Sequence, residues 1–496
     1  MNKAFKMSEQ EQNASKMWSG RFREPLNKRF EDWQRSFPFD VRLLSYELFA
    51  SKAHARMIAA AGILSDEELQ QMLTGLTEVM HTSIRESREL LARAGHKRPD
   101  GDFLDLMHAI VLLAPEAEDI HHFTELQLTK IIGPLALKLH TGRSRNEQIA
   151  TDMRLFVREA IDTTITGLSA WTDALLTLAE EAGDAAMPSY THLQRAEPVL
   201  IAHWLLAYVS MAERDITRFV DARKRLNLCP LGSGAIAGAT LALDRAIAAE
   251  ALGFDAPTPN SMDATSDRDF ALEFTQAASV LGLHMSRFAE ELTLHATAEY
   301  GFLDLPEAFS TGSSAMPQKK NPDFTELIRG KSARLIGSAT ALSVLIKGLP
   351  LAYNKDLQEG QEPVFDAADT LAGMLSILPD FTRALKFREA HMKAASASGY
   401  LNAMAAATYL SNKGIPFRKA HEIIGNAVRL GLESKRELEA IPITELQLLS
   451  PAFEEDFYAA ITLEATLDCH DVIGGTARPR VKQALEDARK RLSGIN

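Results

Sequence analysis

A 13-residue stretch, 311–323, carries the strongest chemical signal in the sequence. It reads TGSSAMPQKKNPD, so a Gly-Ser-Ser turn is followed by two adjacent lysines and an Asn-Pro pair. Small residues allow the backbone to close over an anion and to expose its N–H groups. A hydroxyl beside an ammonium group suits the removal of a proton next to a carboxylate, because the lysine stabilises the charge that develops. Taken alone, the Gly-Ser-Ser turn is also compatible with an ordinary surface turn before a helix.

The string HTGRSRNE at 140–147 predicts an anion-binding site. It contains two arginines, two hydroxyls and an asparagine, and a long helical pattern follows it directly. The helix dipole and the free N–H groups of the first helical turn add to the guanidinium groups in attracting an anion. The alternative is a helix cap with solvated arginines.

His192 lies in the string YTHLQR (190–195), in a predicted break before a helix over 197–226. Histidine titrates near neutrality and can transfer a proton, but it then needs a carboxylate that fixes its ring. Glu326, three residues after Asp323, is our candidate for that carboxylate. A purely structural histidine is the alternative.

Two further strings contain polar side chains suited to a site. In 348–359, Tyr353, Lys355 and Gln358 could contact a polar substrate, or the string could be a capped helix start with an exposed lysine. The string EDIHH at 118–122 raises the question of a metal. No other cluster with metal-ligand spacing accompanies it, so we expect no metal site.

Long helical patterns must position these strings. From 197 to 226 the apolar residues recur on one helical face, and similar patterns are found at 152–181, 263–297, 322–347 and 364–386. Helices longer than ~25 residues imply a bundle or coiled-coil packing, and strand signals are weak throughout. We therefore predict a mainly α fold with an elongated central helical bundle between two smaller helical domains.

Composition excludes several classes of protein. The chain has 496 residues, 46% of them hydrophobic and 24% charged, as in an ordinary globular protein. A net charge of −12 argues against a nucleic-acid surface. No apolar run reaches the ~18–20 residues of a membrane span, so we expect no membrane partner. Two cysteines, Cys229 and Cys469, indicate a reducing compartment, and we expect a cytoplasmic protein.

Almost from end to end, the chain resembles the argininosuccinate lyase family of the fumarase/aspartase superfamily. The pattern GSSxMPxKxNP is typical of the whole superfamily, whereas HTGRSRN, YTHLQRA and YNKDLQ are typical of argininosuccinate lyases. The strings that carry the resemblance are WSGRF (18–22), EDIH (118–121), HTGRSRNEQIATDMRL (140–155), YTHLQRAEPV (190–199), PLGSGAIAG (230–238), SDRDF (266–270), AFSTGSSAMPQKKNPD (308–323), KGLPLAYNKDLQE (347–359), GIPFRKAHEIIG (414–425) and GGT (474–476).

The resemblance implies a carbon–nitrogen lyase of arginine biosynthesis, which reversibly eliminates argininosuccinate to L-arginine and fumarate without a cofactor. It also implies a homotetramer in which central bundles pack together and each active site is shared by several subunits. The implied domains are an N-terminal one over 1–141, the bundle over 142–394 and a C-terminal one over 395–496. We expect a disordered tail at about 1–17 and an extra helical insertion within about 81–117.

The resemblance also implies roles for individual residues. Ser313 takes the proton from the succinyl carbon, and Lys319 and Asn321 hold the carboxylate as it becomes an aci-carboxylate. His192, oriented by Glu326, lies on the side of the leaving nitrogen. The implied carboxylate ligands are Ser36, Arg145, Asn146 and Thr191, and the other implied substrate contacts are Asp119, Tyr353, Lys355 and Gln358.

Four positions depart from the family pattern. Glu197 replaces a usual glutamine, Ala405 replaces an acidic residue, Gly360 lies in a changed QEGQE string, and Arg478 replaces a proline. Glu197 also fits a simpler interpretation, an acidic residue in the first turn of a helix. Two alternatives remain: a superfamily lyase that acts on another fumarate adduct, and an inactive scaffold of the crystallin kind.

Overall fold

The computed structural model describes residues 26–95 and 102–494. The predicted tail at about 1–17 and the WSGRF string lie outside these residues. The described chain separates into two compact units, each built from three segments. Unit 1 comprises residues 1–156, 228–267 and 350–361, and unit 2 comprises residues 157–227, 268–349 and 362–496. The predicted three-domain division stays a prediction.

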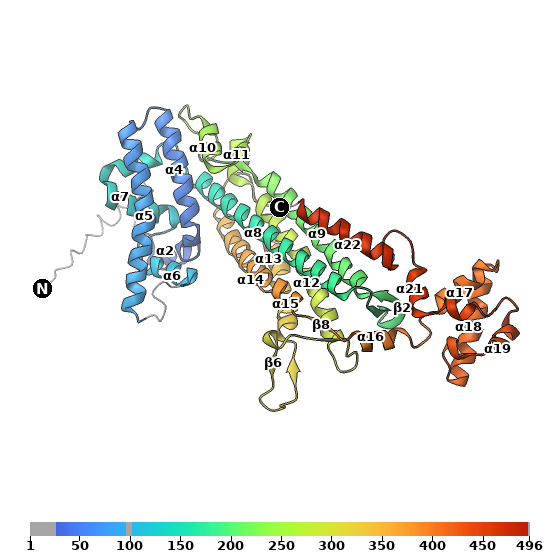
Figure 1. Cartoon of the computed structure of the whole chain (residues 1–496). Coiled ribbons are helices and arrows are strands. Elements are labelled where there is room, and N and C mark those ends of the chain that lie inside the picture. Colours follow the sequence, from blue (N-terminus) through green and yellow to red (C-terminus); the bar gives the residue numbers. More distant parts are fainter. Residues whose placement is uncertain (1–25, 96–101, 495–496) are drawn as a thin grey trace. The chain divides into compact units, whose positions relative to one another are not determined.

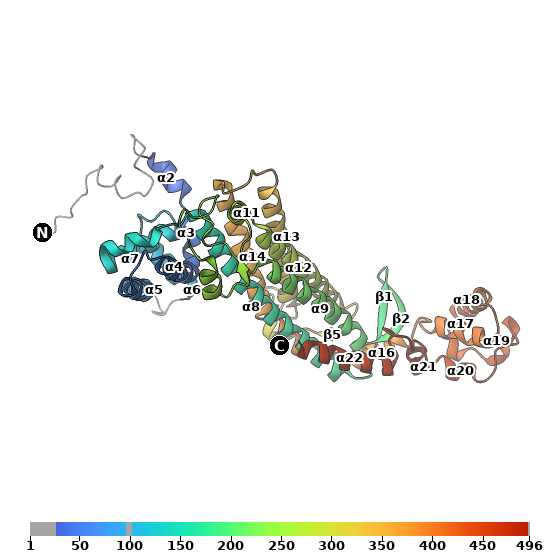
Figure 2. The same cartoon turned by 90° about the horizontal axis from the view of Figure 1, so that it is seen from above.

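Unit 1 is helical (Figures 1 and 2). Its elements are α2 (Lys28–Gln34), α3 (Phe37–Asp40), η2 (Val41–Leu43), α4 (Leu44–Ala60), α5 (Asp66–Arg93), α6 (Phe103–Leu113), α7 (Ile120–Ile132), η3 (Gly133–His140), the beginning of α8 (Arg145–Ala182), β3 (Leu228–Cys229), α10 (Arg245–Leu252), β4 (Ala256–Pro257), α11 (Ser261–Ser266) and η5 (Lys355–Gly360). The described part of the 81–117 stretch contributes the end of α5 and all of α6.

Unit 2 contains the long helices. Its elements are the rest of α8, β1 (Ala186–Thr191), β2 (Gln194–Leu200), α9 (Ile201–Leu226), α12 (Asp269–His295), β5 (Leu303–Asp304), η4 (Glu307–Phe309), β6 (Thr311–Gly312), β7 (Lys320–Asn321), α13 (Asp323–Ile346), α14 (Gln361–Leu375), α15 (Leu378–Arg383), β8 (Lys386–Phe387), α16 (Glu389–Ser396), α17 (Ala403–Asn412), α18 (Phe417–Ser434), η6 (Leu438–Ala440), α19 (Ile443–Leu449), α20 (Phe457–Ala460), α21 (Leu463–Asp468) and α22 (Arg478–Ser493). The mainly α prediction is confirmed.

Aromatic side chains hold the bundle of unit 2 together. Trp171 on α8 is fully buried, and its indole N–H donates to the hydroxyl of Thr382 at 3.2 Å. Its ring meets Phe288 of α12 edge-on, with centroids 5.6 Å apart. Further along, Phe219 of α9 packs on Phe274 of α12. Large rings buried on facing helices stabilise the bundle, from whose ends the loops with the site residues emerge.

The predicted helix over 197–226 is wrong at its start. Residues 194–200 form strand β2, which pairs with β1 as an antiparallel hairpin, and α9 begins at Ile201. Glu197 is therefore in a strand and not in the first turn of a helix. Pro188 and Pro198 lie opposite each other in this hairpin. Proline has no N–H to donate, and it is tolerated here because no third strand pairs with the described ribbon.

Two other predicted helices are interrupted. The pattern over 263–297 divides into α11 and α12, and the break falls at Asp267 and Arg268. The pattern over 364–386 divides into α14 and α15, with Pro379 in the first turn of α15. Proline is favoured at the start of a helix and disfavoured inside one, so it marks this boundary.

Candidate active site

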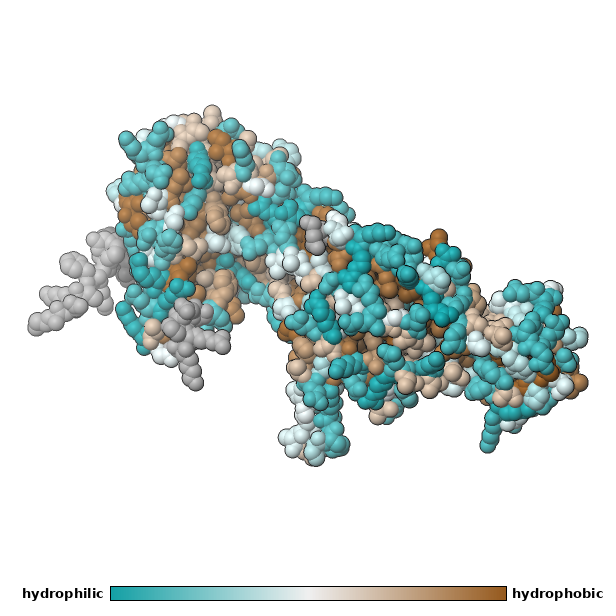
Figure 3. All heavy atoms as spheres, viewed as in Figure 1, coloured by the Kyte–Doolittle hydropathy of each residue, from teal (hydrophilic) through white to brown (hydrophobic). Residues whose placement is uncertain are grey.

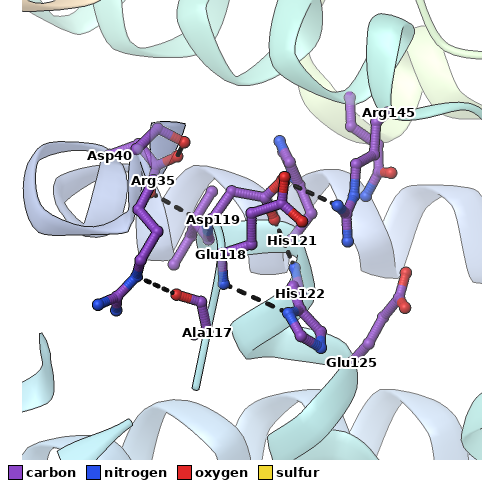
Figure 4. A network of polar contacts seen from close by, with 12 residues as sticks. Arg35, Asp40, Ala117, Glu118, Asp119, His121, His122, Glu125 and Arg145 are labelled. Atoms are coloured by element: carbon purple, nitrogen blue, oxygen red, sulfur yellow. Dashed lines mark hydrogen bonds and ion pairs between the residues drawn. The ribbon is translucent and has the colours of Figure 1, made fainter. Parts of the chain in front are cut away.

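Arg145 is the first residue of α8, where the sequence predicts an anion site. One of its Nη atoms lies 3.0 Å from a carboxylate oxygen of Asp119 (Figure 4). The other oxygen of Asp119 caps α7 by accepting the N–H of His122 at 2.7 Å. Burial would raise the pKa of Asp119, but the charges of Arg145 and His121 and the hydrogen bond from the His122 N–H together lower that pKa. The structure therefore brings Asp119 and Arg145 together as an ion pair at two helix N-termini.

Ser36 is close to this pair through Asp40. The Ser36 hydroxyl donates to one oxygen of Asp40 at 2.6 Å, and the other oxygen accepts the N–H of Ile120 at 3.0 Å. Burial, together with the charge of Asp119, raises the pKa of Asp40 to about 7. A serine hydroxyl has only one proton to donate. Ser36 can therefore serve as a carboxylate ligand only when it releases this bond or when Asp40 carries a proton.

An open cleft of about 660 Å³ lies beside Arg145. It is lined by His140, by residues 142–145 and by the glycine-rich loop 234–240. Asn146 faces the same loop and donates to the carbonyl of Ala235 at 3.2 Å. A cleft at a helix N-terminus with an arginine at its edge suits an anionic ligand.

Glu147 fixes this glycine-rich loop to α8. One carboxylate oxygen accepts the N–H of Gly234 at 2.8 Å, and the other accepts the N–H of Ser144 at 3.1 Å. Gly234 has a φ of 60°, and a Cβ there would lie 2.8 Å from the carbonyl oxygen of Gly238. Glycine is therefore required at this turn. The sequence reasoning assigned no role to Glu147 or to the loop, although the repeated glycines of PLGSGAIAG were a usable signal.

The 350–361 segment belongs to the same unit as Arg145. Gln358 is buried, and its side-chain amide donates to the carbonyl of Gln34, two residues before Ser36, at 3.1 Å. Lys355 is exposed at the start of η5, and Tyr353 is half-buried two residues before it. The structure thus connects Gln358 with the segment that carries Ser36.

His192 lies in unit 2, at the tip of the β1–β2 hairpin. Thr191 pairs with Gln194, so His192 and Leu193 form a two-residue turn with φ values of 55° and 56°. Positive φ at both positions is the type I′ geometry, which matches the twist of a hairpin. Positive φ is uncommon outside glycine, asparagine, aspartate and histidine, so Leu193 is the more strained residue of the turn, and such strain is found at functional sites. The turn leaves Thr191 and His192 exposed.

Ser313 lies in the loop between β6 and β7. The two short strands pair Thr311 with Asn321 and Gly312 with Lys320. The hydroxyl oxygen of Ser313 accepts the N–H groups of Ala315 at 3.2 Å and Met316 at 3.0 Å.

The β6–β7 hairpin projects from the bundle of unit 2 (Figure 1), and its surface is hydrophilic to neutral in Figure 3. Lys319 is exposed on it. The side-chain amide of Asn321 donates to the Thr311 hydroxyl at 3.3 Å and to the Gly312 carbonyl at 3.4 Å. Ser313, Lys319 and Asn321 are therefore presented together on one exposed hairpin.

Glu326 is in the first turn of α13, with 52% of its side chain exposed and Arg329 at 3.9 Å. Within the single described chain, no hydrogen bond or ion pair joins Glu326 to His192, or either of them to Ser313. The structure therefore groups most of the predicted residues into three sets, the Arg145 set of unit 1, the His192 turn and the Ser313 hairpin, and leaves Glu326 on α13 outside them.

One buried group has the donor types of a metal site. Glu47, His121 and Asp152 place their ligand atoms within 4.8 Å of one another. Sequence spacing did not reveal this group, because the companions of His121 come from distant positions in the sequence, and the expectation of no metal site stays a prediction.

Comparison with known proteins places the chain in a family. The family model described as "Lyase" matches residues 105–337, and the one described as "Argininosuccinate lyase C-terminal" matches residues 400–468. The argininosuccinate lyase of Acidobacterium capsulatum is 60% identical over 480 residues, which cover 97% of this chain and 95% of the relative. That of Koribacter versatilis is 56% identical over 97% of this chain and 98% of its own.

Solved structures agree with the fold. An EDDS lyase in complex with formate has a TM-score of 0.76 at 26% identity, covering 92% of this chain and 87% of its own. A 3-carboxy-cis,cis-muconate lactonizing enzyme from Pseudomonas putida has a TM-score of 0.69 at 19% identity, covering 94% and 100% of the two chains, and shows the fold alone. High identity over nearly the whole length distinguishes the relatives above from these more distant lyases. The chain belongs to the argininosuccinate lyase family.

Proposed function

We propose that this chain reversibly cleaves argininosuccinate to L-arginine and fumarate, as the carbon–nitrogen lyase of arginine biosynthesis. The observation that carries this proposal is 60% identity to an argininosuccinate lyase over 97% of the chain. The cleft beside Arg145 supports it, because argininosuccinate presents carboxylates that an arginine at a helix N-terminus can bind.

In this proposal Ser313 removes the proton from the succinyl carbon. A serine is a weak base unless its alkoxide is stabilised. The two backbone N–H groups that donate to its oxygen would stabilise a negative charge there. Lys319 and Asn321, on the same hairpin, would stabilise the aci-carboxylate, and closure of this exposed hairpin over the substrate would exclude water.

On the side of the leaving nitrogen, His192 supplies a proton and Glu326 fixes its ring. The strained turn at His192 supports a functional role, since the fold maintains it in an exposed position. Arg145, Asn146 and Thr191 bind carboxylates, and Ser36 joins them when Asp40 is protonated. Asp119 orients Arg145, while Tyr353, Lys355 and Gln358 contact the rest of the substrate.

A homotetramer with shared sites would bring these separate sets together. The exposed face of α13 supports association with further copies: Leu327, which precedes Gly330, is 58% exposed, and Val344, which follows Gly337, is 59% exposed. A Cβ added at Gly330 or Gly337 would meet nothing within 4 Å, so another helix could approach closely there. In the described part of the chain no helix is both long and apolar enough to cross a membrane. We propose a cytoplasmic location.

The runner-up is a lyase that acts on another fumarate adduct. The EDDS lyase fold supports it, and one related structure of that enzyme is a variant with bound fumarate. Its 25% to 26% identity is far below the 60% of the argininosuccinate lyase relative. The cleavage of argininosuccinate therefore remains the favoured function.

The direct test is to incubate the purified chain with argininosuccinate. We expect fumarate absorbance to rise while arginine appears in equal amount by chromatography. We also expect argininosuccinate to form when arginine and fumarate are supplied together. Fumarate release without arginine, or no release at all, would reject the proposed reaction.

A further inference from the structure

The buried group of Glu47, His121 and Asp152 lies beneath the Asp119–Arg145 pair. Glu47 comes from α4, His121 from α7 and Asp152 from α8, and each is at most 1% exposed. The Nδ1 atom of His121 lies 2.8 Å from Glu47 Oε2 and 3.8 Å from Asp152 Oδ2. These three groups share the interior with buried Arg143, whose positive charge favours the ionised forms of Glu47 and Asp152. The charges must balance, because an unpaired buried charge is costly.

Protein donors already occupy the carboxylate of Glu47. Its Oε1 accepts from the Ser51 hydroxyl at 2.7 Å and from the Gln148 amide at 3.2 Å. Its Oε2 accepts from His121 at 2.8 Å and from the same amide at 3.3 Å. A carboxylate offers about four lone-pair sites. A metal ion would have to displace several of these bonds, so the donor set does not favour a metal.

Asp152, unlike Glu47, has no hydrogen-bond donor next to its carboxyl oxygens in the part of the chain that the structure describes. It is 0% exposed, and neither of its oxygens has a hydrogen-bond partner among the described residues. An ionised aspartate without a donor would be unstable here. If the carboxyl carries a proton, it becomes a donor and can bond to the Glu47 carboxylate, because the four contacts there come from only three donor groups: the single Gln148 amide nitrogen bridges both oxygens. In agreement, burial and then the charge of Glu47 raise the pKa of Asp152 well above its usual range.

With Asp152 neutral, Glu47 and His121 form a one-to-one ion pair. Burial alone would raise the pKa of Glu47, but the charge and the hydrogen bond of His121 lower it to about 2. Burial would likewise lower the pKa of His121, and the charge and hydrogen bond of Glu47 raise it instead. The pair thus joins α4 to the first turn of α7.

The first turn of α7 also positions Asp119, the partner of Arg145. Three consecutive residues are fixed there. Asp40 fixes the Ile120 N–H, and Glu47 fixes the His121 ring. The third is the His122 N–H, which Asp119 accepts (Figure 4). The remaining oxygen of Asp119 faces Arg145 at 3.0 Å. A shift of the α7 terminus would therefore carry Asp119 away from the guanidinium group.

We propose that Glu47 and His121 are positioning residues for the Asp119–Arg145 pair, and that Asp152 is a neutral acid that donates its proton to Glu47. The inference rests on the proposed function, in which Arg145 binds a substrate carboxylate. A residue that only places a substrate ligand affects substrate binding more than the chemical step.

The kinetic test compares Glu47→Gln with Glu67→Gln, an exposed glutamate on α5. We expect Glu47→Gln to raise KM for argininosuccinate at least about tenfold with little change in kcat, and Glu67→Gln to change neither. In an Asp119→Asn background, Glu47→Gln should add less than about a twofold change, because both act through Arg145. A lower Tm with an unchanged KM, or fully additive effects, would overturn the positioning role.

The test of Asp152 uses no substrate. Asp152→Asn keeps the shape and supplies an N–H donor to Glu47, so Tm should stay within about 2 °C of the unaltered protein. Infrared spectra at neutral pH should show a carboxylic-acid carbonyl band that this variant loses. A stoichiometric bound metal that Asp152→Asn releases, or the absence of the acid band, would overturn the neutral acid. If the unaltered chain does not cleave argininosuccinate, the proposed function fails, and these two measurements still decide the state of Asp152.

Discussion

At the scale of single residues, the site is defined by where protons can reside. The oxygen of Ser313 receives two backbone N–H groups, whereas the Ser36 hydroxyl gives its proton to Asp40. The same functional group is thus prepared for opposite tasks: the Ser313 oxygen accepts two N–H groups and is stabilised for negative charge, whereas the Ser36 hydroxyl acts as a donor. Residue type alone does not distinguish these cases, because the difference lies in the neighbouring donors.

Ser313→Ala should abolish turnover and leave substrate binding nearly intact, because the hydroxyl acts in the transition state. The measurements are kcat by fumarate release and Kd by calorimetry. Ser314→Ala, which removes the adjacent hydroxyl, is the matched control and should lose much less activity. Residual activity of Ser313→Ala within about tenfold of the unaltered protein, a loss of only ~1.4 kcal/mol, would rule out Ser313 as the base.

His54 should make the stability of unit 1 depend on pH. Burial, with help from the charge of Arg143, lowers its pKa from the usual 6.5 to about 3. The unfolded chain takes up a proton below about pH 6.5, while the folded chain does not until about pH 3. The stabilisation by neutral His54 is therefore complete above the pKa of the unfolded chain, and it is lost as the pH falls from that pKa towards the pKa of the folded chain.

The matched variant is His54→Gln, which can still donate to the Thr141 carbonyl that His54 contacts at 3.0 Å. When the pH falls from about 7 to about 5, the free energy of unfolding of the unaltered protein should decrease by about 2 kcal/mol more than that of this variant. Urea unfolding midpoints at the two pH values measure the difference. Equal losses in the two proteins would show that His54 does not titrate in this way.

At the scale of elements, the sequence predicted the long helices well and the short hairpins poorly. Amphipathic patterns over many turns located α8, α9 and α13 closely. The β1–β2 hairpin was missed because its strands pair only with each other, so no buried alternating pattern marks them. A long helix can be recognised from its own periodic pattern, whereas a short hairpin is recognised mainly from its turn residues. The pair His192-Leu193 is not typical of a hairpin turn.

Two departures from the family pattern have structural partners in this chain. Glu197 on β2 lies 3.6 Å from His470, and Arg478 at the start of α22 bonds Asp468 at 3.0 Å. Ala405 is buried in the C-terminal core of unit 2. These contacts serve packing between elements, so we see no reason in them to change the proposed substrate.

The position of the glycine-rich loop 234–240 should depend on its hydrogen bond to Glu147. Glu147→Gln retains one acceptor oxygen where the carboxylate has two, so one backbone N–H of the cleft wall loses its partner. Burial raises the pKa of Glu147 to about 7, so the lost hydrogen bond lies between a neutral and a charged one, and at about 1–2 kcal/mol we expect KM for argininosuccinate to rise by about five- to thirtyfold. Glu250→Gln, an exposed change on α10, is the control. An unchanged KM in Glu147→Gln would show that the loop keeps its place without this bond.

At the scale of the whole molecule, the family resemblance supplied candidate site residues, which stay predictions, but not the contacts that support them. Arg145 and Ser313 lie in contiguous strings that the sequence displays directly. The Glu47–His121 pair is formed by residues 74 positions apart, so only the folded chain reveals it. Within the described part of unit 2, no hydrogen bond or ion pair joins the His192 turn to the Ser313 hairpin, which is a reason to expect an assembly.

We expect a tetramer by light scattering, because the exposed apolar face of α13 needs partners. Mixing His192→Ala with Ser313→Ala subunits should then restore part of the activity, since some shared sites would receive both intact residues. An active monomer near 54.6 kDa would contradict the assembly. No recovery after confirmed subunit exchange would place both groups of a site on one chain.

The central claim is that argininosuccinate is the substrate, and the measurement that tests it most directly is kcat/KM for a panel of fumarate adducts. Arg145, Asn146 and Lys319 suit the succinyl end, which all these compounds share, so discrimination must come from the rest of the substrate. We predict efficient cleavage of argininosuccinate and negligible turnover of malate, aspartate and adenylosuccinate. A higher kcat/KM for aspartate or adenylosuccinate would contradict the proposed substrate. It would not contradict the fold or the proposed acid–base residues.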